Sequence, residues 1–147
     1  MITFVPLRLN HLPMMTGWLA RPHLTKWWTR GKTYTLEEIV KMYGSRARGE
    51  DPTKGFVLER DGVPAGYAQF SPRGEQATVD LFLADEGSGH GVEALRAFLT
   101  DEVFPRFRVA VVDPLKTNAR ALAVYERLGF TKQSETAEKV VLAAVRP

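Results

Sequence analysis

A glycine-rich turn between a hydrophobic segment and an amphipathic one is the first place where this sequence could do chemistry. The stretch "EGSGHG" covers residues 86–91, after "VDLFLAD" and before "VEALRAFL". Its glycines alternate with two polar residues, in the order Gly87, Ser88, Gly89, His90 and Gly91. The first N–H groups of a helix lack partners and its dipole is positive there, so such a turn can bind an anion as bulky as a pyrophosphate. The alternative interpretation is that the glycines serve only the geometry of the turn.

Two familiar phosphate motifs fit this turn poorly. A nucleoside-triphosphate loop needs a lysine and then a serine or threonine at the helix start, whereas Val92 and Glu93 follow Gly91. A dinucleotide fingerprint needs its third glycine three positions after the second, and too little chain remains after Asp113 to complete such a domain. Both motifs are therefore weakened as explanations of the turn.

Asp80 is the most unusual residue by pattern, because it interrupts the apolar run "TVDLFLA". Aspartate is disfavoured inside strands. Simple alternation predicts that Val79, Leu81 and Leu83 share one face and that Asp80, Phe82 and Ala84 share the other. The carboxylate is then either exposed at an edge without a role or directed into a cleft.

Aromatic and histidine side chains offer weaker signals. Trp27 and Trp28 are adjacent within "LTKWWTR"; we expect one to pack in the core and the other to form a wall of a ligand site, since flat aromatic rings stack on sugars or hold cations. His11, His23 and His90 show no metal-ligand spacing. No metal is expected, and His11 and His23 are expected to be structural or solvent-facing.

The helices and strands that position these residues are predicted from hydrophobic periodicity and from residues that typically begin or end such elements. We expect strands at 3–9, 55–60, 64–70, 77–85, 106–113 and 138–145, and helices at 10–20, 35–49, 91–104 and 118–130, with a loop or short helix at 21–28. Asn10 and Asn118 are candidate helix N-caps, Thr35 with Glu38 forms a capping-box signature, and Asp61-Gly62 predicts a tight hairpin. The order predicts an α/β or α+β domain around one sheet.

Composition limits the possible classes. A chain of 147 residues with 44% hydrophobic and 25% charged residues is expected to form one globular domain, residues 1–147. It has no cysteine, which excludes disulfides and thiolate sites and is typical of a cytoplasmic protein. No apolar run approaches a membrane span, and a net charge of +3 without a dense basic block does not predict nucleic-acid binding.

Together, the glycine turn and "DPLKTNARALAVYERLGF" resemble the GNAT superfamily of acetyl-CoA-dependent N-acetyltransferases. The second motif matches in order, spacing and residue type, at Asn118, Ala121, Tyr125, Glu126, Gly129 and Phe130. The resemblance implies a GNAT fold, with one central, mixed and mostly antiparallel sheet flanked by helices and splayed between its fourth and fifth strands. It also implies acetyl-CoA as co-substrate.

Within that superfamily the chain is similar to aminoglycoside 6′-N-acetyltransferases along nearly its whole length. The matching segments, in order, are "WLARPHLTKWW", "GVPAGYAQF", "VDLFLAD" and "DPLKTNARALAVYERLGF". By this resemblance Asp80 binds the acceptor ammonium and takes its proton, and Tyr125 donates to the departing thiolate. The implied acetyl-CoA-binding residues are Phe82, Leu83, Gly87, Ser88, Gly89, His90, Gly91, Asn118, Ala121 and Tyr125. The implied acceptor-binding residues are Trp27, Trp28, Gln69, Asp80 and Asp113.

The chain departs from the family pattern in its glycine turn. Glu86 stands where glutamine or arginine is usual, Ser88 stands where a basic residue is common, and the segment after Asp80 is shorter. The pyrophosphate would then depend on backbone N–H groups and the helix dipole, with help from His90 and from Lys116 or Arg120.

The function expected from the sequence is transfer of acetyl to a primary amine of a small polycationic acceptor, with the 6′-amine of an aminoglycoside first, which would confer antibiotic resistance. A siderophore or amino-acid N-acetyltransferase is one alternative, and a non-catalytic acyl-CoA-binding module is another. We expect a small-molecule partner, no nucleic acid and no membrane, and a monomer or homodimer.

Overall fold

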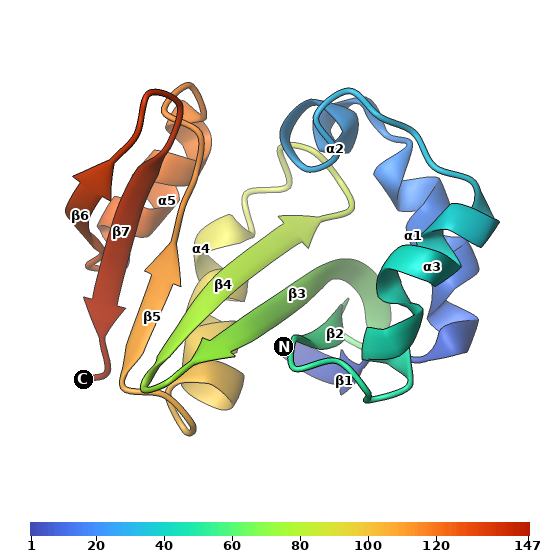
Figure 1. Ribbon diagram of the computed structural model, residues 1–147, viewed down its shortest axis with the longest axis horizontal. Coiled ribbons are helices and arrows are strands. Elements are labelled where there is room, and N and C mark those ends of the chain that lie inside the picture. Colours follow the sequence, from blue (N-terminus) through green and yellow to red (C-terminus); the bar gives the residue numbers. More distant parts are fainter. The chain divides into compact units, whose positions relative to one another are not determined.

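The computed structural model describes residues 1–147, which form strands, helices and short connections in alternation (Figure 1). The strands are β1 (Ile2–Pro6), β2 (Lys54–Arg60), β3 (Val63–Arg73), β4 (Gln76–Leu83), β5 (Val109–Val112), β6 (Thr131–Glu135) and β7 (Val140–Val145). The helices are η1 (Leu9–His11), α1 (Leu12–Leu19), α2 (Pro22–Trp27), α3 (Leu36–Ala47), α4 (Gly91–Phe98), η2 (Leu99–Val103) and α5 (Ala119–Arg127). η1 is a 3₁₀ turn and η2 is a π-helical continuation of α4.

One mixed sheet contains all seven strands in the order β1-β2-β3-β4-β5-β7-β6. β1 with β2, β5 with β7, and β6 with β7 are antiparallel, whereas β4 and β5 are parallel. The parallel register joins Gln76 to Val109, Ala77 to Ala110 and Thr78 to Val111, and β4 continues beyond this register to Leu83. This pattern confirms the expected mixed, mostly antiparallel sheet.

Several local signals act as the sequence predicts. Thr35 caps α3, where its side chain accepts the N–H of Glu38 while the Glu38 side chain accepts the N–H of Thr35. Asp61 and Gly62 both have positive φ, 51° and 81°, as the two central residues of a tight hairpin turn require. Asn118 caps α5.

Some elements differ from expectation. Asn10 does not cap a helix but lies inside η1, and α1 begins at Leu12. β1 ends at Pro6 rather than at residue 9. β6, "TKQSE", was not expected, because all five of its residues are exposed and carry no apolar alternation.

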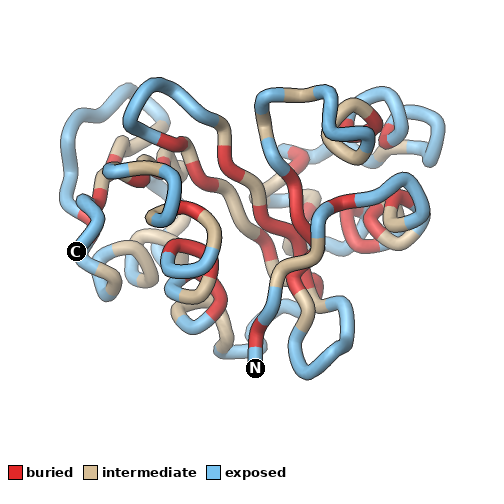
Figure 2. Tube along the Cα trace, turned by 90° about the horizontal axis from the view of Figure 1, so that it is seen from below, coloured by how far each residue is buried: buried red, intermediate tan, exposed pale blue.

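The chain folds into two compact units. The first comprises residues 1–69 and 81–87, and the second comprises residues 70–80 and 88–147. Most buried residues lie in strands and helices, whereas most residues of the connecting segments are exposed (Figure 2).

Each unit has its own buried side chains. In the first unit they form one cluster: Leu7, Leu12, Met15, Trp18, Leu19, Leu24, Ile39, Tyr43, Val57, Tyr67, Phe82 and Ala84. In the second they include Phe70, Val79, Leu95, Phe98, Val103, Ala110, Val112, Phe130 and Leu142. Within the second unit, β7 lies between β5 and β6 (Figure 1).

Candidate functional site

Two carboxylates lie just beyond the paired residues of the parallel strands in the second unit. Thr78 on β4 is in register with Val111 on β5. Asp80 lies two residues after Thr78, and Asp113 lies two residues after Val111 and directly beyond β5, so both stand at the carboxyl ends of the paired segments. This edge of a parallel pair is where α/β proteins bind ligands.

Tyr125 on α5 lies within the electrostatic reach of both carboxylates. Its side chain is half-buried and its ring contacts Phe130, with ring centroids 5.5 Å apart. Burial raises the pKa of the Tyr125 phenol well above its ordinary value, and the negative charges of Asp80 and Asp113 raise it further. Tyr125 is therefore a neutral hydrogen-bond donor at any ordinary pH.

The beginning of α5 is fixed by Asn118, whose side-chain oxygen accepts the N–H of Ala121 at 3.2 Å. Asn118 was expected to bind acetyl-CoA, and in the structure its oxygen caps the helix that carries Tyr125. Ala121 is half-buried on the first turn of that helix.

The glycine turn leads into α4 as expected. Gly87 and Gly89 have φ of 68° and 77°, a conformation that glycine adopts at little cost. His90 precedes the helix, and its Nδ1 lies 3.6 Å from a carboxylate oxygen of Glu93. A Cβ placed on Gly91 would lie 3.6 Å from Val124. The N-terminus of α4 is therefore beside the middle of α5 in the second unit.

In the first unit, Trp28 joins an aromatic cluster. Its ring meets Phe82 edge-on, with centroids 4.9 Å apart, and its indole N–H donates to the hydroxyl of Tyr43 at 3.1 Å. Trp27 is half-buried, and the ammonium of Lys26 lies 4.7 Å from its ring centroid. The expectation that one tryptophan packs in the core is confirmed by Trp28.

Gln69 on β3 is held by two donors. Its side-chain oxygen accepts the hydroxyl of Tyr67 and a guanidinium N–H of Arg46, both at 2.8 Å. The guanidinium also lies over the ring of Tyr43, 4.8 Å from the centroid. The Nε of Arg46 is buried without a hydrogen-bond partner. The sequence analysis missed Arg46, since a charged residue inside a helix has no distinguishing pattern.

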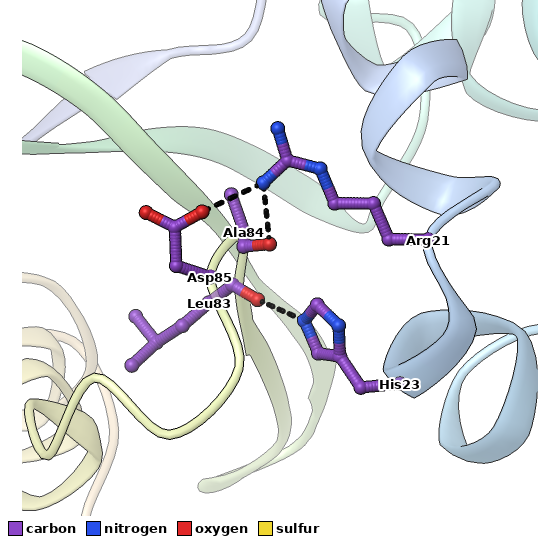
Figure 3. Close-up of polar contacts among 5 residues, drawn as sticks. All are labelled: Arg21, His23, Leu83, Ala84 and Asp85. Atoms are coloured by element: carbon purple, nitrogen blue, oxygen red, sulfur yellow. Dashed lines mark hydrogen bonds and ion pairs between the residues drawn. The ribbon is translucent and has the colours of Figure 1, made fainter.

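Two side chains of the α2 region hold the end of β4 (Figure 3). The Nε2 of His23 lies 3.0 Å from the carbonyl oxygen of Leu83. A carbonyl can only accept, so His23 donates from Nε2. Arg21 donates to the carbonyl of Ala84 at 2.7 Å and to the Asp85 carboxylate at 2.8 Å. His23 is therefore structural, as expected, whereas nothing in the sequence pointed to Arg21.

The alternation expected along β4 is wrong in its second half. Ala77 and Val79 are buried, but the next buried residues are Phe82 and Ala84, so the buried face changes between Val79 and Phe82. Asp80 and Phe82 consequently do not share one uninterrupted face. Phe82 packs in the core of the first unit, and Asp80 belongs to the second.

The predicted site residues divide between the two units. Trp27, Trp28, Gln69, Phe82, Leu83 and Gly87 belong to the first unit, and Asp80, Ser88, Gly89, His90, Gly91, Asp113, Asn118, Ala121 and Tyr125 belong to the second. Within the second unit, Asp80 and Asp113 lie near enough to Tyr125 for their charges to raise its pKa, and Gly91 lies against α5. No group of three or more histidine, cysteine, aspartate or glutamate side chains is placed to hold a metal ion. No helix is long and apolar enough to cross a membrane.

The second unit thus contains a parallel strand pair with a carboxylate beyond the paired residues of each strand, a tyrosine on α5 and the beginning of α4. Residues 8–137 match a family model described as an acetyltransferase (GNAT) domain, and the chain belongs to this family. Aminoglycoside N(6′)-acetyltransferase type 1 from Klebsiella pneumoniae is 30% identical over 151 residues, which cover 88% of this chain and 75% of that protein. A protein of the same name from Serratia marcescens gives the same values.

Solved structures agree with this family. The aminoglycoside acetyltransferase AAC(6′)-Ib in complex with coenzyme A has a TM-score of 0.86 at 26% identity, covering 99% of this chain and 95% of that one. AAC(6′)-Ib with ribostamycin and coenzyme A also gives 0.86 at 26% identity, covering 99% and 93%. An aminoglycoside N(6′)-acetyltransferase from Legionella pneumophila, at 17% identity and a TM-score of 0.82 over 98% of this chain and 91% of that one, supports the fold alone.

Proposed function

We propose that this chain is an acetyl-CoA-dependent N-acetyltransferase whose acceptor is a primary amine on a small polycation, in the first place the 6′-amine of an aminoglycoside. The observation that carries the proposal is that Tyr125 lies close enough to Asp80 and Asp113 for both negative charges to raise its pKa. The similarity to aminoglycoside N(6′)-acetyltransferases supports the choice of acceptor.

The glycine turn is compatible with a bound pyrophosphate. Gly87 and Gly89 take positive φ, and nothing lies within 4 Å of a Cβ built on either residue, so open space adjoins the backbone before α4. The N-terminal N–H groups of α4 and its dipole would hold the phosphates. When bound, acetyl-CoA supplies an acetyl group activated as a thioester. The exposed Glu86 opposes anion binding, and we assign it no role in holding the phosphates.

Asp80 is proposed to bind the reacting ammonium and to accept its proton, directly or through water. An alkyl ammonium has a pKa of about 10 and is not a nucleophile until that proton leaves. Asp113, which directly follows β5, would bind a second ammonium of the acceptor. Trp27, Trp28 and Gln69 are proposed as further acceptor contacts.

Tyr125 is proposed to stabilise the departing sulfur by donating a hydrogen bond from its hydroxyl. A thiol has a pKa of about 8.5, and the pKa of Tyr125 is raised above its ordinary value of 10.0. Complete proton transfer from Tyr125 to the thiolate is therefore unfavourable, and stabilisation by an oriented donor is the role that fits.

The test is thiol release from acetyl-CoA with paired acceptors that carry either a 6′-amine or a 6′-hydroxyl. The parent should acetylate the amine and turn over the hydroxyl compound poorly. Asp80→Asn should lower kcat/KM for the amine at least about thirtyfold, because breaking a buried charge pair costs about 2–5 kcal/mol. Asp101→Asn, which changes an exposed carboxylate on η2, is the matched control.

An amino acid and a hydroxylamine-type siderophore precursor belong in the same assay. Turnover of either in place of the aminoglycoside would reassign the acceptor, and no thiol release with any amine would favour an acyl-CoA-binding module. A monomer or homodimer remains the prediction for the assembly.

A further inference from the structure

The ammonium of Lys139 lies against the carboxylate of Asp113. The Nζ of Lys139 is 3.6 Å from Oδ2 of Asp113, and 43% and 42% of the two side chains are exposed. Both residues belong to the second unit, and Asp113 directly follows β5. A cation therefore already occupies a position where an acceptor ammonium is proposed to bind.

The backbone holds Lys139 at this position. Lys139 forms an antiparallel bridge with Leu115, and the N–H of Val140 donates to the carbonyl of Pro114 at 3.0 Å. The N–H of Lys139 donates to the Thr136 hydroxyl at 3.0 Å, and its carbonyl accepts the N–H of Thr136 at 2.9 Å. The segment that follows Asp113 is thus tied directly to the segment that carries Lys139.

The neighbouring lysines are paired with a different carboxylate. Lys116 and Lys132 both contact Glu135, at 2.9 and 2.8 Å. They hold the pKa of the exposed Glu135 carboxyl at about 2. Of the two lysines within residues 131–145, Lys139 is the one that pairs with a carboxylate of the proposed site.

We propose that Lys139 is a resident counter-ion that sets the charge selectivity of the acceptor site. An acceptor ammonium that approaches Asp113 meets the ammonium of Lys139, which repels it and competes with it for the carboxylate. Lys139 therefore weakens the binding of polycationic acceptors relative to acceptors whose only ammonium is the reacting one. This inference rests on the proposed function, which assigns Asp113 to the acceptor.

The expected size of the effect follows from the exposure of the pair. Because partly exposed ion pairs contribute modestly, removal of Lys139 should lower KM for a polycation by up to about fivefold. The kcat should change little, because Lys139 contacts neither the reacting amine nor Tyr125 in this assignment. A purely structural role of Lys139 would instead change KM equally for all acceptors.

The experiment measures KM and kcat for two acceptors with the parent and with Lys139→Met. Ribostamycin serves as the polycation, and a methyl 6-amino-6-deoxyglucoside offers a similar amine without a second ammonium. Lys139→Met should lower KM for ribostamycin about fivefold and leave that for the monoamine within about twofold. Lys139→Arg retains the charge and should behave as the parent.

Two controls separate a local effect from a general effect of charge. Lys132→Met makes the same change of net charge beside Glu135, and it should leave the ratio of the two KM values unchanged. In an Asp113→Asn background, Lys139→Met should no longer lower KM, because the two residues act as a coupled pair. Equal effects of Lys132→Met and Lys139→Met, or an undiminished effect in the Asp113→Asn background, would overturn the proposal.

Calorimetric titration with ribostamycin in the presence of coenzyme A distinguishes the two hypotheses. Tighter binding by Lys139→Met without turnover by any variant would support the counter-ion and contradict the proposed function. Turnover by the parent with unchanged KM in Lys139→Met would contradict the counter-ion alone. If no variant binds or acetylates ribostamycin, both are wrong.

Discussion

Arg46 donates a guanidinium N–H to the side-chain oxygen of Gln69 at 2.8 Å, and the hydroxyl of Tyr67 donates to the same oxygen. With its oxygen fixed by two donors, the Gln69 amide has a single orientation. A charged donor makes this arrangement stronger than a neutral pair of donors would.

The Arg46 contact predicts a split between stability and acceptor binding. Arg46→Met loses a hydrogen bond but also removes an Nε that is buried without a partner, so the free energy of unfolding should change by less than about 1 kcal/mol. If Gln69 contacts the acceptor, its KM should rise by about threefold or more, since the amide can then rotate. Arg48→Met, which removes a more exposed guanidinium that pairs with Glu50, is the control. An unchanged KM in Arg46→Met would remove Gln69 from the acceptor site.

Gly66 is required by the close approach of two strands in the first unit. A Cβ on Gly66 would clash with the carbonyl oxygen of Phe82, and a backbone atom cannot easily move aside. Gly66→Ala should lower the free energy of unfolding by about 1–3 kcal/mol. Gly17→Ala, with nothing within 4 Å and a helical position in α1, should be neutral or stabilising. Denaturant titrations of the two variants measure the difference.

Gly89 tests the glycine turn. Gly89→Val imposes a side chain at φ of 77°, and Gly74→Val imposes one at 62° in the same unit, with open space at both positions. Each should lose about 1–2 kcal/mol of stability, because the left-handed conformation is unfavourable with a Cβ. Only Gly89→Val should also weaken acetyl-CoA binding about tenfold or more, equivalent to 1.4 kcal/mol. Equal calorimetric affinities for the two variants would contradict the phosphate assignment.

Tyr125→Phe tests the oriented donor. The variant keeps the ring against Phe130 and removes only the hydroxyl, so kcat should fall about 10²–10³-fold with little change in acetyl-CoA affinity. A variant that turns over at nearly the parent rate would make Tyr125 a packing residue.

The raised pKa of Tyr125 predicts a dependence of stability on pH. Above pH 10 the unfolded chain loses the phenol proton while the folded chain retains it, so the parent should lose stability as pH rises. Tyr125→Phe should show a smaller loss over the same range. Identical pH profiles of unfolding would show that the phenol is not perturbed.

The sequence predicted those parts of the fold that local signals specify. The capping box of Thr35, the hairpin at Asp61-Gly62 and the cap at Asn118 each depend on residues within a few positions of one another. β6 escaped prediction because "TKQSE" buries nothing and forms only through pairing with β7. The change of buried face within β4 also has no local signal, since it arises where the strand passes from one unit to the other.

The residues of the candidate site also differ in whether a local sequence signal identifies them. Asp80 and Tyr125 could be singled out because a carboxylate inside an apolar strand and a tyrosine inside a long motif are unusual. Arg46 and Lys139 could not, because arginine and lysine are common on helices and turns and only tertiary contacts distinguish these two. The sequence therefore singles out candidate reacting residues more readily than the residues that contact them.

The exposed residues of β6 also bear on solubility. β6 is the last strand of the sheet order, so one of its sides offers unpaired backbone groups to any extended chain. Lys132 and Glu135 place opposite charges on that strand, and Glu135 is further paired with Lys116. At the other end of the order, β1 ends in Pro6, which has no N–H to donate. Both borders of the sheet therefore carry features that oppose edge-to-edge aggregation and strand exchange between copies.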